Sequence, residues 1–279
     1  MKKILFPTDF SKTAENAFFY ALKLAKKIDA ELLLAHIYEL PDFGSTLKNT
    51  SQEVHEMMDM ETFENFKSSV NQLREKAEEK GLDKVEWSQM MMQGEVTNSI
   101  TSLAAKENVD LIVMGTKGAT GLQGLFLGSN AAGVINHAKC PVLSIPEKVD
   151  PSQAIDKIGY LTNYADEEVH GFDEVLDLAT TFSASVNVIH YEKDATEIDD
   201  DQMNNWKNKL SNKGKNIHSE IITGTHFEEA ISQFAHKENI TLLAIQPRRR
   251  NFFISFFKTK KSKQIIQHIS IPLYTLPEK

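Results

Sequence analysis

Short apolar runs alternate along the chain with longer segments in which apolar residues recur at helical spacing. Runs of the length and composition of buried strands lie at 4–6, 31–37, 85–91, 111–114 and 142–145. Helical spacing occupies the segments between them, at 14–25, 53–80, 94–104 and 128–138. Strands that alternate with helices predict an α/β fold built on a doubly wound, five-stranded parallel sheet.

The same pattern restarts after a short hinge at 148–154. KIGYLTNYA at 157–165 parallels KILFPTDFS at an offset of 154, and SVNVIH at 185–190 parallels ELLLAH at the same offset. ITLLAIQPRR at 240–249 parallels VDLIVMGTKG at an offset of 131. A repeat of one supersecondary pattern indicates tandem duplication. We therefore predict two domains of one fold, at 1–147 and 154–279, the second shortened around its second helix.

Composition narrows the class of protein. A chain of 279 residues with 41% hydrophobic and 25% charged residues has the length and balance of two globular domains. The first apolar run ends at Pro7, too early for a signal peptide, and no run reaches membrane-spanning length. A single cysteine suits a reducing compartment, so we expect a cytoplasmic protein. The net charge of −8 disfavours nucleic-acid binding.

A glycine-rich loop follows the apolar run at 111–114. Glycines stand at 115, 118, 121 and 124, and a helical pattern begins at Gly128 and Ser129. Glycine lets the backbone approach a phosphate closely, and the free N–H groups of a helix's first turn favour an anion. This arrangement predicts an anion site at the carboxyl end of the fourth strand.

The spacing Gly115-x2-Gly118-x9-Gly128-Ser129 resembles the motif G-x2-G-x9-G-[S/T] of the universal stress proteins, and KKILFPTDFS resembles that family's first strand. The resemblance implies a Rossmann-like fold, similar to the adenine nucleotide alpha hydrolases, with strand order 3-2-1-4-5. It implies ATP or AMP as ligand, with or without Mg²⁺. It also implies contact between the two fifth strands, 142–145 and 273–276, as an intramolecular pseudo-dimer, and leaves a further homodimer open.

The resemblance also assigns roles to individual residues. Asp9 would bind the adenosine portion, Ile37 would lie against the adenine, and Ser129 would bind phosphate with the backbone N–H groups of Gly118 and Gly128. The full set of expected nucleotide-binding residues is Pro7, Thr8, Asp9, Ile37, Met114, Gly115, Gly118, Gly128, Ser129 and Asn130. Simpler interpretations remain open: Asp9 as a helix cap, Gly115 and Gly118 as a tight turn, and Gly128 with Ser129 as an ordinary helix start.

The second half lacks the polar and glycine residues of this motif. At the two offsets, Asp9 becomes Asn163 and Gly115 becomes Gln246. The remaining motif positions become Arg249, Thr259 and Lys260. We therefore expect one nucleotide site per chain, in the first half.

The resemblance implies a nucleotide-binding regulatory module of the stress response. Two alternatives stay open: a slow ATPase or phosphotransfer enzyme, and a stress-response scaffold that binds no nucleotide. No catalytic or metal-ligating residue stands out. The basic, aromatic segment PRRRNFFISFFKTKKSK at 247–263 has two interpretations, packing residues of the second half or a surface for an anionic partner or a membrane.

Overall fold

The computed structural model describes residues 2–39, 51–116, 128–166, 168–193, 200–210, 217–246 and 271–277. The elements of the first half are β1 (Lys2–Pro7), α1 (Lys12–Ile28), β2 (Ala30–Tyr38), α2 (Ser51–Glu79), β3 (Trp87–Gln93), α3 (Val96–Lys106), β4 (Leu111–Gly115), α4 (Ser129–His137) and β5 (Val142–Ile145). Those of the second half are β6 (Lys157–Thr162), α5 (Glu168–Phe182), β7 (Ser185–Glu192), α6 (Asp200–Leu210), β8 (Ile217–Thr223), α7 (Phe227–Lys237), β9 (Leu242–Ile245) and β10 (Leu273–Thr275).

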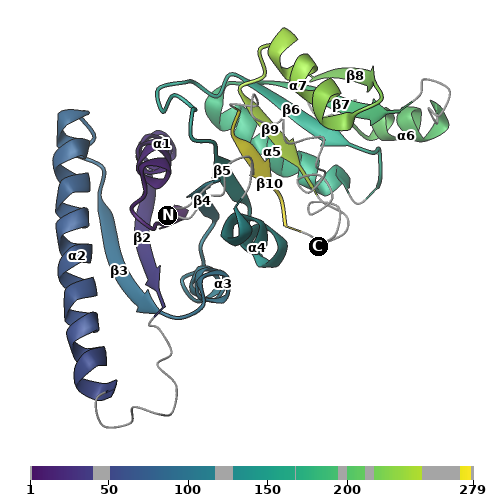
Figure 1. Ribbon diagram of the computed structural model, residues 1–279. Coiled ribbons are helices and arrows are strands. Elements are labelled where there is room, and N and C mark those ends of the chain that lie inside the picture. The colour runs from purple at the N-terminus through teal and green to yellow at the C-terminus, as the bar shows by residue number, and fades with distance from the viewer. Residues whose placement is uncertain are drawn as a thin grey trace.

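All ten described strands form one continuous sheet (Figure 1). Its order is β3-β2-β1-β4-β5-β10-β9-β6-β7-β8, which confirms the order 3-2-1-4-5 for the first half and repeats it in the second. Within each half the strands pair in parallel, as the near-continuous apolar runs predict. The sequence predicted two sheets, and the structure joins them because β5 and β10 pair antiparallel.

The strand registers of the two halves correspond under the sequence offsets. In the first half Lys3 pairs with Glu31, and in the second half the positions 154 residues later, Lys157 and Ser185, also pair. Ile4 pairs with Leu111, and their counterparts Ile158 and Leu242 pair as well. The non-glycine residues with left-handed backbone correspond too: they are Phe10 and Tyr164, Asp29 and Ser183, and Asn108 and Asn239.

The contact between β5 and β10 has the register of a two-fold axis. Leu143 lies opposite Tyr274, its own counterpart at the offset of 131. The flanking pairs, Ser144 with Leu273 and Val142 with Thr275, exchange under the same offset. Equivalent surfaces that meet around a two-fold axis make an isologous contact, as in a symmetric dimer.

Helices cover both faces of the sheet in both halves. Helices α1, α2, α5 and α6 contribute to one hydrophobic core, with Phe18, Phe66, Phe172 and Trp206 among its large buried side chains. Helices α3, α4 and α7 contribute to the other core, on the opposite face. The carboxyl ends of the parallel strands are thereby left as the edge at which ligands bind in open α/β sheets.

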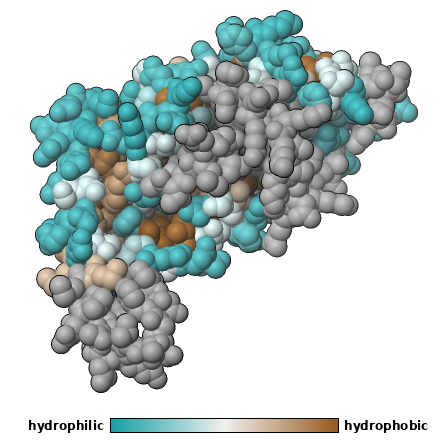
Figure 2. Space-filling model, in the orientation of Figure 1, coloured by the Kyte–Doolittle hydropathy of each residue, from teal (hydrophilic) through white to brown (hydrophobic). Residues whose placement is uncertain are grey.

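Hydrophilic residues dominate the molecular face drawn in Figure 2, and apolar residues show in small areas between them. Among the described helices, none has both the length and the apolar character needed to cross a membrane.

Candidate functional site

The loop after β1 is hydrogen-bonded to β2. The buried Thr8 donates its N–H to the carbonyl of Ala35 at 2.9 Å, and its hydroxyl oxygen accepts the N–H of Phe10 at 3.0 Å. Phe10 adopts a left-handed φ of 58°, a conformation that is costly for a bulky residue. The chain therefore turns sharply at Phe10, directly after Asp9, at the carboxyl edge of the sheet.

The polar residue that this loop presents at the edge is Asp9, which is exposed. Its Oδ1 accepts the N–H of Ser11 at 3.0 Å, while the Ser11 hydroxyl accepts the N–H of Ala14 at 3.2 Å as the N-cap of α1. Ser11 rather than Asp9 is thus the N-cap residue of α1. Asp9 fixes the loop before the helix and leaves its carboxylate at the surface, beyond the central strand.

His36 belongs to the scaffold of this edge. Its Nδ1 donates to the carbonyl of Thr8 at 2.8 Å, and its ring stacks against Phe66 at a centroid distance of 6.1 Å. His190 makes the same bond to Thr162 at 2.8 Å in the second half. Because this contact is present in both halves, we assign it to the fold rather than to a ligand site. The neighbouring Ile37 is half-buried at the end of β2.

The glycine motif lies at the end of β4. Met114 is buried and Gly115 half-buried, and the N–H of Thr116 donates to the carbonyl of Ile145 at 3.1 Å. Gly118 and the rest of the loop at 117–127 lie outside the described residues. Because β1 and β4 are adjacent parallel strands, Asp9 and this motif lie at the same edge of the sheet.

Helix α4 begins at this edge of the sheet, and its first residues are exposed. Gly128 is its N-cap and has no side-chain cap bond, and both Ser129 and Asn130 are exposed. The first helical bond runs from the N–H of Ala132 to the carbonyl of Gly128, at 3.0 Å. The earlier N–H groups of the first turn therefore point toward the end of the helix, where the dipole favours an anion.

One expected phosphate donor is already engaged. The Gly128 N–H, which the motif suggested for phosphate, donates to the carbonyl of Thr116 at 2.5 Å and so draws the two ends of the loop together. The amides of Ser129 and Asn130, with the Ser129 hydroxyl, are the donors that fit an anion at this helix.

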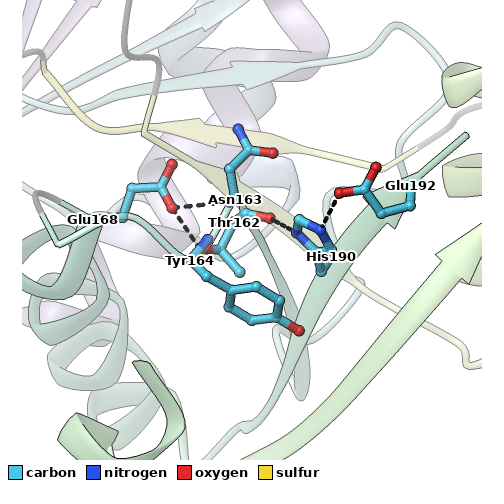
Figure 3. A network of polar contacts seen from close by, with 6 residues as sticks. All are labelled: Thr162, Asn163, Tyr164, Glu168, His190 and Glu192. Carbon is cyan, nitrogen blue, oxygen red and sulfur yellow. Dashed lines mark hydrogen bonds and ion pairs between the residues drawn. The ribbon is translucent and has the colours of Figure 1, made fainter. Parts of the chain in front are cut away.

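The second half fills the corresponding edge with its own side chains (Figure 3). Glu168 is buried, and its Oε2 accepts the Thr162 hydroxyl at 2.5 Å and the N–H groups of Asn163 and Ala165 at 2.9 and 3.3 Å. The Asn163 side chain points away from Glu168. The Glu168 carboxylate thus accepts the N–H of Ala165, the residue equivalent to Ser11. In the first half, Asp9 accepts the N–H of Ser11.

Two more side chains add bulk at this edge. Tyr191, at the position of Ile37, donates its hydroxyl to the carbonyl of Gly224 at 2.5 Å. Gln246, at the position of Gly115, is 9% exposed and lies over Gly171 of α5. The comparison of the two halves in sequence identified Gln246 as a replacement of a motif residue. It did not identify Glu168, which the offset of 154 places opposite the apolar Ala14.

The pair Gln246 and Gly171 replaces the pair Gly115 and Ala17 of the first half. A Cβ atom added to Gly171 would lie 2.2 Å from Gln246 Oε1 and 3.0 Å from Leu276 Cδ1. We expect Gly171→Ala to lower the free energy of unfolding by about 1–3 kcal/mol, because it overpacks a buried site.

A double-mutant cycle measured by urea unfolding checks this expectation. Combined with Gln246→Gly, the Gly171→Ala substitution should lose most of its cost, because the first half packs with that combination. Additive effects of the two substitutions would contradict the packing exchange.

The described residues offer little for metal or thiol chemistry. Within them, no group of three or more His, Cys, Asp and Glu side chains could hold a metal ion. Burial raises the pKa of the Cys140 thiol to about 11, so this thiol is protonated at neutral pH. The features of the site that remain are an exposed carboxylate and a helix N-terminus.

Comparison with known proteins identifies the family of the first half. The model of the universal stress protein family matches residues 1–146, slightly more than half of the chain. The chain belongs to the universal stress protein family. Universal stress protein MJ0531 of Methanocaldococcus jannaschii is 37% identical over 145 residues, which cover 52% of this chain and 81% of that protein. Universal stress protein MJ0577 of the same organism is 30% identical over 159 residues, which cover 53% of this chain and 96% of that protein.

A solved universal stress protein extends the likeness to the whole chain. The crystal structure of a universal stress protein from Archaeoglobus fulgidus covers 99% of this chain and 96% of its own, with a TM-score of 0.68 and 17% identity. At this identity the likeness concerns the fold alone. Membership in the universal stress protein family thus rests on the first half. The likeness of the whole chain to the Archaeoglobus fulgidus protein concerns the fold of both halves.

Proposed function

We propose that this universal stress protein is an adenine-nucleotide-binding regulatory module with one site, at the carboxyl edge of the first half. The observation that carries the proposal is the contrast between the halves. The first half leaves Asp9, Ser129 and Asn130 exposed there, whereas the second fills the equivalent edge with Glu168 and Gln246. Replacement of the site residues in one half alone favours a ligand in the other.

Each part of the nucleotide has a matching group. The Asp9 carboxylate accepts the hydroxyl groups of the ribose, and Ile37 offers apolar contact to the adenine. The phosphates bind at the N-terminus of α4, to the amides of Ser129 and Asn130 and to the Ser129 hydroxyl. Pro7, Thr8, Met114 and Gly115 shape the edge between these contacts, and Gly118, whose N–H the motif assigns to the phosphates, lies outside the described residues.

The second half serves as a structural partner. Domains at 1–147 and 154–279 join through β5 and β10 as a fused pseudo-dimer, in agreement with the two-fold register of that contact. Nucleotide then regulates by stabilising one conformation of the cytoplasmic protein through differential affinity. Chemistry is not required for this role, and an ATPase would need a water-positioning base beside the phosphates.

The phosphate position can be tested with Asn130→Asp. The introduced carboxylate at the α4 N-terminus would repel phosphate, and we expect ATP binding to weaken roughly tenfold while adenosine binding changes little. Helix stability should not fall, because a negative charge at a helix N-terminus is favourable. Isothermal titration calorimetry measures both ligands.

Asn71→Asp is the matched control, since Asn71 is exposed on α2, away from this edge. Equal losses of ATP and adenosine affinity in Asn130→Asp would place the phosphates elsewhere. Incubation with ATP followed by chromatography separates binding from turnover: ATP recovered intact supports a binding module, and turnover abolished by Asp9→Ala supports the enzyme. No binding of any nucleotide would leave the scaffold alternative.

A further inference from the structure

Strand β3 is the last strand at one end of the ten-stranded sheet that the described residues form. In the described part of the chain β2 is the only strand that pairs with it. Its sequence, WSQMMMQ, has seven residues and carries neither a charge nor a proline. Natural proteins usually protect such an edge with charges, prolines or bulges, because its free N–H and C=O groups can pair with another chain.

The opposite end of the same sheet shows such protection. Strand β8 occupies the equivalent position in the second half, and its register matches that of β3: Leu32 pairs with Trp87, and Val186 with Ile217. By this register Glu220 of β8 stands where β3 has Met90. Two edges of one fold therefore differ in the feature that discourages strand pairing.

Exposed apolar side chains lie beside the uncharged edge. Among the large hydrophobic residues described, Met60 and Phe63 of α2 are the exposed ones, at 71% and 47%. Residues 59–74 of α2 span about 22 Å, close to the roughly 23 Å of a seven-residue strand, and α2 runs alongside β3 (Figure 1). The helix thus accompanies the strand along its full length.

The orientation of α2 places these side chains on the β3 side. At 100° per residue, Met60, Phe63, Lys67 and Arg74 fall within about 60° of one another around the helix. Arg74 reaches β3, because its guanidinium lies 4.1 Å from the ring of Trp87 and donates to Gln89 at 2.7 Å. The opposite flank faces α1, where Lys76 pairs with Glu15. Met60 and Phe63 therefore add exposed apolar area on this side of β3, beside the positive charges of Lys67, whose Nζ lies 5.5 Å from the Phe63 ring centroid, and of Arg74.

We propose that this edge pairs with a second copy of the chain. Strand β3 lies antiparallel to its own counterpart around a two-fold axis near Met90, the middle residue of the strand, with Met60 and Phe63 covered at its margin. The chain already contains this kind of contact, since β5 and β10 are equivalent strands that meet antiparallel around a two-fold axis. An uncharged strand is compatible with itself in this arrangement, and strand addition at a free edge is a common mode of association. One strand pair and two side chains per copy make a small interface, so the dimer should be weak and concentration-dependent.

Sedimentation velocity over a wide range of protein concentration tests the proposal. We expect a monomer–dimer equilibrium in the wild-type chain, and a dissociation constant raised roughly tenfold or more by Met90→Glu, which places like charges side by side. Because β8 carries a glutamate at this position, the fold should tolerate the substitution. Gln233→Glu, which adds the same charge on an exposed position of α7, is the control and should leave dimerisation unchanged.

Phe63→Lys provides a second variant outside the strand, and it too should weaken the dimer while circular dichroism stays unchanged. A wild-type chain that remains monomeric at every concentration would overturn the proposal. So would dimerisation that Met90→Glu and Phe63→Lys leave intact, because the contact would then lie elsewhere. The proposed nucleotide contacts do not include Met90 or Phe63, so the dimerisation measurements can be interpreted independently of the nucleotide titrations.

Discussion

Replacing Asp9 with alanine is expected to weaken adenine-nucleotide binding by roughly 10- to 100-fold. Asp9 is exposed at the carboxyl end of the central strand, and it offers the ribose a charged acceptor. Hydrogen bonds to charged groups contribute about 1.5–3 kcal/mol, which corresponds to this range of affinity. Isothermal titration calorimetry with ATP and AMP measures the loss.

Asn163→Ala is the matched control, because Asn163 holds the equivalent position in the second half. We expect this variant to bind like the wild type. Asp9→Asn separates the two roles of the residue: it can still accept the Ser11 N–H that Asp9 accepts at 3.0 Å, but it lacks the charge. If Asp9→Ala binds nucleotide as well as the wild type, the carboxylate does not contact the ligand and the proposed site is wrong.

Glu168→Ala should lower the free energy of unfolding of the second half by about 2–4 kcal/mol. The Glu168 carboxylate is 3% exposed and accepts from Thr162, Asn163 and Ala165. Its removal leaves these donors without the acceptor, and an unsatisfied buried donor costs about 1–3 kcal/mol. In the first half, where Ala14 stands at this position, Asp9 Oδ1 accepts the N–H of Ser11, the counterpart of Ala165.

Urea unfolding followed by the fluorescence of Trp206 measures this effect locally. Trp206 is buried beside the loop and donates its Nε1–H to the carbonyl of Ala165 at 3.1 Å. The chain has two tryptophans, so a Trp87→Phe background leaves Trp206 as the sole reporter. Glu78→Ala, the same change at an exposed position of α2, should shift stability by less than about 0.5 kcal/mol. Equal effects of the two substitutions would show that the Glu168 network does not stabilise the second half.

The fold was predictable because its signals are local and repeated. The apolar runs of β1, β2, β4 and β5 gave the strands, and the offsets of 154 and 131 gave their correspondence in register. Ser11 and Gly128 cap α1 and α4 as their residue types suggest. The strand order came from the family resemblance, since the period of apolar residues does not specify which strands are neighbours.

Two predicted boundaries were wrong for identifiable reasons. The third strand was expected at 85–91 and lies at Trp87–Gln93, because the buried Val85 instead closes a turn by donating its N–H to Leu82 at 3.1 Å. The next helix starts at Val96 rather than at Gly94, because the Glu95 carboxylate caps it. Hydrogen bonds from the N–H groups of Asn98 and Thr97 lower the pKa of Glu95 accordingly.

The candidate site was predictable in its residue types but not in its contacts. The motif indicated Gly128, whereas its N–H bond to Thr116 depends on the way the loop closes. The buried Glu168 was missed because a glutamate at a helix start normally lies in solvent. Gly118 and the segment at 247–263 lie outside the described residues, so their roles stay predictions.

The number of adenine nucleotides bound per chain tests the central claim most directly. The purified protein is saturated with ATP, freed of excess nucleotide and denatured, and the released nucleotide is counted by chromatography. We predict one adenine nucleotide per chain for the wild type and a marked loss for Asp9→Ala. Two nucleotides per chain would contradict the filled second half, and none would contradict the proposed site.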